Sequence, residues 1–332
     1  MIPAVLRLSA AFALVFAVAC APASSSPSAT PTAVPSTAAP ATQPATPTTA
    51  PTATPTPIPL PTFAYVAAAG NGVVWLFVNG DHLFRSTDRG DTWSQRTLPQ
   101  PTVPNGRIAF VSAQDGWLMS VGSPATQCSG QSIALWRTSD GAATWSQVNP
   151  TGIDNAQCKD AIAFVDTQHG YIGASDPNTQ PRIYRTADGG KSWSSSTLPN
   201  PPAQRPAAFA DFGGVVLASA ESGAAPDRYY TFRSTNGGAS WTGASAGPIE
   251  GLPVVFVTAT RWLQIIVPSQ SQETTDGGAS WHAYTTDYQQ AAPVAPQIAF
   301  GDAMTGYATV RGSIQRTLDG GAHWSAIRTP GT

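Results

Sequence analysis

The chain has 332 residues, a formal net charge of −2 and only 11% charged residues, against about 25% in an average soluble domain. A balance this close to neutral lacks the basic surface that nucleic-acid binding requires, and it argues against that class of partner. Ten Trp, 30 Gly and 31 Pro favour a turn-rich β protein with aromatic packing.

Residues 1–20 are typical of an export signal. Arg7 precedes the apolar stretch 8–19, which is too short to cross a bilayer as a helix. The segment Ala17–Ala19 before Cys20 fits a lipobox, with Cys20 as the lipidated residue, and it also contains an A-x-A site for ordinary signal peptidase. A charge-free tether begins directly after Cys20 and favours the lipobox. We therefore expect a membrane-anchored lipoprotein at the cell surface or in the periplasm.

Residues 21–62 form a low-complexity segment with 12 Pro, 11 Thr and no charged residue. Such a segment cannot bury enough apolar surface to fold. We expect a disordered linker, stiffened by its prolines, between the anchor and a folded domain over residues 63–332.

Six copies of an eight-residue motif, [S/T]-x-D-x-G-x-[S/T]-W, run through residues 63–332. An Asp or Asn at the third position can form an Asx-turn, Gly supplies positive φ, and Trp can pack between sheets. One carboxylate per turn falls short of a calcium cage, so we expect structural boxes without metal or cofactor. The third and eighth positions are Asp88 and Trp93, Asp140 and Trp145, Asp188 and Trp193, Asn236 and Trp241, Asp276 and Trp281, and Asp319 and Trp324.

The spacing of the boxes indicates the fold. Successive box tryptophans are 52, 48, 48, 40 and 43 residues apart, a period typical of propeller blades. An apolar segment with Phe recurs between boxes, as in 108–117, 162–171 and 298–307. Each unit therefore predicts a four-stranded meander, and the whole predicts an all-β propeller of six blades, or of seven if one blade lacks a recognisable box.

These residues resemble the Asp-box, or BNR, repeat of sialidases, sortilin-type receptors, some glucanases and the photosystem II assembly factor (Ycf48-like) family. The fuller unit, I-A-F-V-D-x-x-x-G-Y followed by Y-R-T-x-D-G-G-x-S-W, is most similar to the last of these. The resemblance covers residues 63–332 and implies a protein-binding assembly or scaffold role on membrane complexes. The box departs from its pattern at Arg89, Ala142, Asn236 and His323.

In such a meander the boxes share one face with the first-to-second turns. The second-to-third and blade-to-blade connections share the other, the box-free face. Its longest second-to-third connections are 122–132, 173–182 and 219–228, in blades 2 to 4. Binding residues concentrate on loops held by a rigid scaffold, so we expect the binding site there. The candidates, chosen by loop position and side-chain chemistry, are Asp154, Lys159, Asp176, Asn178, Arg182, Glu221, Asp227, Arg228 and Tyr229.

Two further residue sets are interpreted as structural. Cys128 and Cys158 fall in neighbouring connections on the box-free face and form an even pair if Cys20 carries lipid, so we predict a disulfide between them. An arginine precedes five boxes, and because it follows the repeat we expect one intra-blade contact from each rather than an anion-binding ring. These are Arg85, Arg137, Arg185, Arg233 and Arg316, with Glu273 in their place in blade 5.

The residues of a sialidase-like enzyme are not found as a set. The nearest segment to its Arg-Ile-Pro motif is Pro181–Tyr184, in blade 3 and without the Pro, and the only glutamates are Glu221, Glu250 and Glu273. The four histidines show no metal or triad pattern. We therefore predict a non-catalytic, monomeric propeller that binds a protein or glycan ligand on the box-free face. The alternatives are a glycan-binding or sialidase-like glycosidase propeller, and a sortilin-like peptide receptor.

Overall fold

The computed structural model describes residues 64–123, 128, 130–176, 179–199, 205–222, 227–267, 269–289, 297–310 and 313–330. The predicted export signal, the linker with Cys20, and Asn178 lie outside the described residues. In the described ranges, 24 strands form six four-stranded antiparallel sheets, each made of four consecutive strands. The predicted all-β propeller is confirmed with six blades.

The first three blades follow the boundaries that the sequence repeat indicates. Blade 1 contains β1 (Ala64–Gly70), β2 (Val73–Val78), β3 (His82–Ser86) and β4 (Ser94–Arg96). Blade 2 contains β5 (Arg107–Phe110), β6 (Gly116–Val121), β7 (Ile133–Thr138) and β8 (Ser146–Val148). Blade 3 contains β9 (Cys158–Phe164), β10 (Gly170–Asp176), β11 (Thr179–Thr186) and β12 (Ser194–Thr197).

The last three blades repeat this order, with the shortest strands in blade 5. Blade 4 contains β13 (Arg205–Asp211), β14 (Val216–Glu221), β15 (Tyr229–Ser234) and β16 (Thr242–Ala246). Blade 5 contains β17 (Val255–Phe256), β18 (Trp262–Gln264), β19 (Gln272–Thr274) and β20 (His282–Ala283). Blade 6 contains β21 (Gln297–Phe300), β22 (Gly306–Val310), β23 (Ser313–Thr317) and β24 (Ser325–Ile327).

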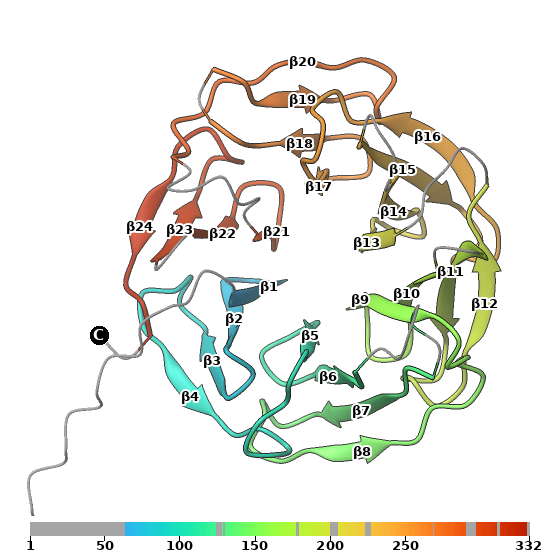
Figure 1. Ribbon diagram of the computed structural model, residues 1–332. Helices are drawn as coiled ribbons and strands as arrows, with labels where there is room; N and C mark the ends of the chain where they lie inside the picture. The colour runs from blue at the N-terminus through green and yellow to red at the C-terminus, as the bar shows by residue number, and fades with distance from the viewer. Residues whose placement is uncertain are drawn as a thin grey trace, which may run out of the picture. The chain divides into compact units, whose positions relative to one another are not determined.

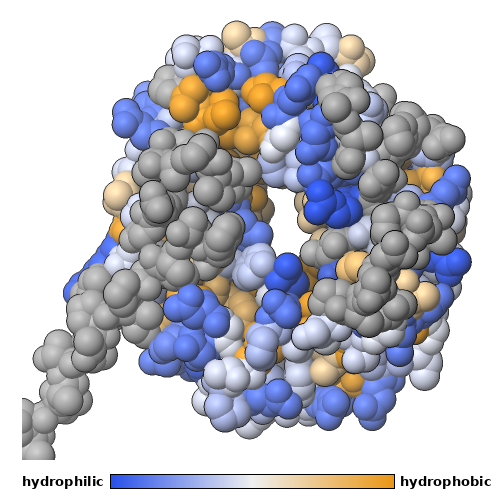
Figure 2. Space-filling view, viewed as in Figure 1, coloured by the Kyte–Doolittle hydropathy of each residue, from blue (hydrophilic) through white to orange (hydrophobic). Residues whose placement is uncertain are grey.

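The blades stand around a central channel (Figure 1). The first strand of each blade is nearest the axis and the fourth strand is on the outside. The channel stays open in the space-filling view, where strongly hydrophilic residues border it (Figure 2).

The hydrophobic core is divided among the joints between blades. Neighbouring strand residues point to opposite sheet faces, so Tyr171 packs against blade 4 while Ile172 packs against blade 2. Six buried clusters result, one at each joint, including the joint between blades 6 and 1. Each blade is therefore held mainly by its two neighbours.

The boxes form the turns between the third and fourth strands. In the box of blade 5, Thr274 donates its hydroxyl to Asp276 at 2.8 Å and accepts the amide of Gly278 at 2.9 Å, while Asp276 accepts the amide of Ser280 at 2.9 Å. The fourth and fifth positions have positive φ in every box. Arg89 and Ala142 adopt it without being glycine, at 62° and 60°. The expected structural role of the boxes agrees with this geometry.

The ring closes without a strand shared between the first and last blades. Arg316 of blade 6 donates to the carbonyl of Arg89 at 2.8 Å and pairs with Asp91 at 2.7 Å. The indole of Trp93 donates to the carbonyl of Arg328 at 2.9 Å. Together with the apolar cluster around Ile314, these contacts make the closing joint resemble the internal ones.

Candidate functional site

A disulfide lies on the box-free face. Cys128 and Cys158 are bonded, with their Cα atoms 4.9 Å apart, which agrees with the expected pairing. The bond ties the long second-to-third connection of blade 2 to the start of β9 in blade 3. Lys159, the next residue, donates its backbone amide to Oε1 of Gln131 at 2.7 Å.

On the same face, three residues form a row across the ends of the strands of blade 4. In the strand register, Glu221 lies opposite Arg205 on one side and opposite Tyr229 on the other. Arg205 and Glu221 form an ion pair of 2.7 Å, in which the carboxylate is 18% exposed and the guanidinium 54%. The row therefore presents a charged pair beside a phenol at the box-free rim.

Asp227 completes what we call the blade 4 rim cluster, defined as Arg205, Glu221, Asp227 and Tyr229. Burial, followed by the negative charges of Glu221 and Asp227, raises the pKa of Tyr229 to about 12, while Arg205 acts in the opposite direction. The phenol therefore stays neutral near pH 7 and can donate a hydrogen bond. The cluster thus combines two carboxylates, a cation and a neutral hydroxyl donor.

Arg228 and Glu250 lie next to this cluster. Their closest charged atoms are 3.9 Å apart, and the carboxylate of Glu250 is 60% exposed. Ser222 donates its hydroxyl to Asp227 at 3.3 Å, and Arg228 donates to the carbonyl of Gly247 at 3.4 Å. Four of the nine residues predicted for binding, Glu221, Asp227, Arg228 and Tyr229, are thus brought together at one rim.

The candidates in blade 3 have different surroundings. Lys159 is only 3% exposed, and its ammonium donates to the carbonyls of Gln131, Asp154 and Gln157. This corrects the expectation that Lys159 contacts a ligand at the surface, because its ammonium is buried and bonded to backbone carbonyls. Asp154 is exposed and accepts the amide of Ala156 at 2.7 Å, Arg182 is half-buried on β11, and Asp176 ends β10.

Arg85 and Arg137, two of the arginines before the boxes, make the expected intra-blade contacts and also reach the next blade. Within their own blades, Arg85 lies over the ring of Trp75 at 5.7 Å and Arg137 over the ring of Trp117 at 5.2 Å. Arg85 of blade 1 donates to the carbonyl of Ala113 in blade 2 at 2.8 Å. Arg137 of blade 2 lies 3.1 Å from where a Cβ on Gly189 of blade 3 would stand. The guanidinium reaches the next blade because the third strand ends beside that blade's box.

A second feature of the box-free face was not indicated by the loop lengths. A pocket of about 210 Å³ lies between blades 1 and 2, lined by Tyr65, Phe77, Asn79, Gly80, Asn105, Gly106 and Arg107. Its residues come from the starts of β1 and β5, from β2, from the turn between β2 and β3, and from the connection between blades 1 and 2. The Asn-Gly pairs 79–80 and 105–106 were the available sequence signal, since they mark tight turns on this face.

The described residues contain no group of three or more His, Cys, Asp or Glu side chains placed to hold a metal ion. No helix long and apolar enough to cross a membrane occurs in the described parts of the chain either.

Comparison with known proteins connects the chain to carbohydrate-active enzymes. No protein-family model matches it. A xyloglucanase of a Paenibacillus species is 31% identical over 162 residues, which is 41% of this chain and 15% of the relative. The xyloglucanase Xgh74A of Acetivibrio thermocellus is 32% identical over 160 residues, 40% of this chain and 18% of the relative. The chain therefore spans less than a fifth of the length of the curated relatives that it matches.

The chain is also similar in fold to solved structures, a Ycf48 protein among them. A protein of unknown function from Dyadobacter fermentans has a TM-score of 0.52 at 16% identity, covering 80% of this chain and 94% of its own. Ycf48 bound to a D1 peptide has 0.44 at 18% identity, covering 81% and 82%. A GH74 enzyme of Niastella koreensis has 0.45 at 15% identity, covering 78% and 46%. Identities this low show the fold alone.

The prediction that the protein is not an enzyme is wrong on this comparison. The curated proteins that it matches at 31–32% identity are xyloglucanases, which points to a glycan-active enzyme. The sequence lacks the residue set of a sialidase, but a pair of carboxylates contributed by the ends of neighbouring strands leaves no motif in the chain.

Proposed function

We propose that this propeller acts on xyloglucan or a related β-glucan, and that the polysaccharide is cleaved at the blade 4 rim cluster. The observation that carries the proposal is the match to xyloglucanases over 40–41% of the chain. The cluster supports it because Glu221 and Asp227 both lie close enough to Tyr229 to raise the pKa of its phenol.

Hydrolysis of a glycosidic bond uses two carboxyl groups, one to protonate the leaving oxygen and one to act as base or nucleophile. In the proposed arrangement, Glu221, which is paired with Arg205, is the base or nucleophile. Asp227, two residues before β15, is the acid. Tyr229 donates a hydrogen bond to a sugar hydroxyl, since its raised pKa keeps the phenol protonated.

The test uses the full chain with tamarind xyloglucan and with a mixed-linkage β-glucan. Release of reducing ends, together with retardation of the protein in a xyloglucan-containing native gel, supports the proposal. Glu221→Gln and Asp227→Asn should each lower the rate by at least about 100-fold, the usual contribution of general acid–base groups. Glu250→Gln is the matched control, because this carboxylate lies on the same rim but is mostly exposed. If the unaltered protein shows no release of reducing ends and no retardation, both the proposed activity and the proposed binding are rejected.

Recognition of a protein segment on this face is a second candidate function. It is favoured by the adjacent Arg228 and Tyr229, since Arg and Tyr are enriched among the residues that dominate protein interfaces. In this version the protein is exported, anchored through lipidated Cys20, and uses its linker to present the propeller to a membrane complex. Retardation by xyloglucan would count against it. Capture of a membrane protein by the unaltered chain, lost in an Arg228→Ala and Tyr229→Ala double variant, would favour it.

A further inference from the structure

The pocket between blades 1 and 2 has a single charged residue in its described lining. Arg107, the first residue of β5, places its guanidinium over the ring of Tyr65 at 4.5 Å from the ring centre. One of its terminal nitrogens, Nη1, donates to the carbonyls of Gly106 at 3.1 Å and Asn105 at 3.4 Å. These contacts hold the guanidinium in place at the wall of the pocket.

The other donors of Arg107 are unused. Nε and Nη2 have no hydrogen-bond partner among the described residues, and no carboxylate there pairs with Arg107, which is only half-buried. The described lining contains no Asp or Glu. The arginine at the corresponding place in blade 4, Arg205, is neutralised by Glu221 at 2.7 Å. Within the described part of the chain, Arg107 is therefore an oriented positive charge with two adjacent N–H groups that have no partner.

The walls of the pocket are rigid. A Cβ on Gly106 would stand 2.7 Å from the ring of Phe77, and a Cβ on Gly80 would stand 2.9 Å from the carbonyl of Val103. Asn79 and Asn105 hold positive φ values of 54° and 53°. Because the backbone around Gly80 and Gly106 is packed this closely, the guanidinium of Arg107 is held at the pocket wall before any ligand binds.

We propose that this pocket binds one carboxylate group of a small ligand, such as a uronic acid or another hydroxy acid, through Nε and Nη2 of Arg107. Two parallel N–H groups match the two oxygens of a carboxylate. The volume of about 210 Å³ is below the roughly 300 Å³ at which sites for drug-sized ligands begin, so the occupant is a single small unit. The amides of Asn79 and Asn105 supply polar partners for its hydroxyl groups.

The experiment titrates the full chain with D-glucuronate, D-glucose and N-acetyl-L-alanine by isothermal calorimetry at low salt. Binding of D-glucuronate but not D-glucose is expected, and it should weaken as ionic strength rises because one charge pair carries it. N-acetyl-L-alanine tests whether the carboxylate of a peptide end is accepted in place of that of a sugar acid. Failure of both carboxylates to bind would overturn the proposal.

Variants assign the binding to this pocket. Arg107→Gln should weaken D-glucuronate binding by at least about tenfold, and Arg107→Lys should restore only part of it, since a lysine cannot offer the paired donors. Arg89→Gln is the matched control, because it removes one positive charge from an exposed arginine in the box of blade 1, on the opposite face. Loss of binding in Arg89→Gln with retention in Arg107→Gln would overturn the assignment. The outcome does not depend on whether the chain cleaves xyloglucan, since no β-glucan is used.

Discussion

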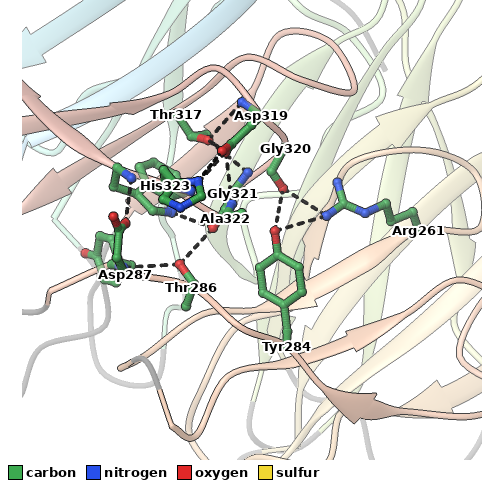
Figure 3. A network of polar contacts seen from close by, with 12 residues as sticks. Arg261, Tyr284, Thr286, Asp287, Thr317, Asp319, Gly320, Gly321, Ala322 and His323 are labelled. Atoms are coloured by element: carbon green, nitrogen blue, oxygen red, sulfur yellow. Dashed lines mark hydrogen bonds and ion pairs between the residues drawn. The ribbon is translucent and has the colours of Figure 1, made fainter.

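Nε of Arg261 lies 2.6 Å from Oε1 of Glu273, and the same guanidinium donates through Nη2 to the carbonyl of Gly320 in blade 6 at 2.9 Å. Glu273 occupies the position where the other blades have arginine. In blade 5 the arginine comes instead from the residue before β18, and it reaches the box of the next blade as the others do (Figure 3). The joint between blades 5 and 6 therefore also contains a guanidinium, but a residue before the second strand supplies it instead of the third strand.

Arg261→Leu should destabilise the protein by about 1–3 kcal/mol, because it leaves the carboxylate of Glu273, 13% exposed, without its main partner. The double variant Arg261→Leu with Glu273→Leu should lose less than the single one, since no charge is then stranded. Urea denaturation of the two variants measures the difference. Equal losses would mean that Glu273 is already satisfied by His282, its other partner at 3.1 Å.

The closing joint should depend on Arg316. Arg316→Gln removes the pair with Asp91, a largely exposed carboxylate, and the bond to the carbonyl of Arg89, so we expect a cost of about 1–2 kcal/mol. Hydrogen exchange should accelerate in β1 and β24, because no shared strand holds these blades together. Arg137→Gln, at an internal joint, is the control and should leave exchange in β1 and β24 unchanged. Unaltered exchange in Arg316→Gln would show that the apolar cluster alone keeps the ring closed.

Trp193→Ala should cost about 3–5 kcal/mol, as expected for truncating a buried large side chain. Trp193 is 6% exposed, its ring meets that of Phe164 edge-on with centres 6.1 Å apart, and its indole donates to the carbonyl of Gly190 at 2.8 Å. Trp145→Ala, at a half-buried box tryptophan, should cost less. Thermal or urea unfolding of the two variants checks the order, and a reversed order would contradict it.

Arg89→Gly should stabilise the protein by about 1 kcal/mol, because a non-glycine residue at a φ of 62° is strained. Gly277→Ala at the same box position in blade 5 is the reciprocal change. A Cβ there would meet nothing closer than the ring of Trp262 at 3.9 Å, so any loss of stability reports backbone strain at its φ of 72°. We expect a loss of similar size. Stabilities that move in the same direction in both variants would contradict this account.

The boxes should make the protein sensitive to acid. Hydrogen bonds, first from a box hydroxyl and then from other box groups, lower the pKa of Asp88, Asp140, Asp188 and Asp276 to about 2 from 3.8. A carboxyl with a lowered pKa in the folded state stabilises the fold above its unfolded pKa and loses that contribution as pH falls. Stability should therefore decline from about pH 4 to about pH 2.

Asn236 occupies the same box position in blade 4, so exchanging Asp and Asn at this position tests whether the box carboxylates cause the acid sensitivity. Its side chain accepts the amide of Ser240 at 3.0 Å without carrying a charge. Asp276→Asn should flatten the decline of melting temperature below pH 4, and Asn236→Asp should steepen it. Profiles identical to that of the unaltered chain would show that other carboxyl groups control acid unfolding.

The candidate site was predictable in part. Glu221, Asp227, Arg228 and Tyr229 were found because a long connection on a propeller must project from the face opposite the boxes. Lys159 was misjudged, because only the folded loop brings three carbonyls around its ammonium. Arg107 and Tyr65 were missed, since they lie in the first strands of two different blades and not in the long connections where binding residues were expected.

The sequence by itself determined the four-stranded blade and the box, because these depend on turn chemistry within eight consecutive residues and on a strand period that local propensity encodes. It left six and seven blades both open, and the structure has six. Only the tertiary structure decided what meets across the joints. Arg85 and Arg316 contact the following blade, Arg261 takes the place of the arginine missing from blade 5, and Arg107 lies over Tyr65. Those contacts depend on the angle at which blades pack around the channel, and the burial of side chains from both neighbours sets that angle.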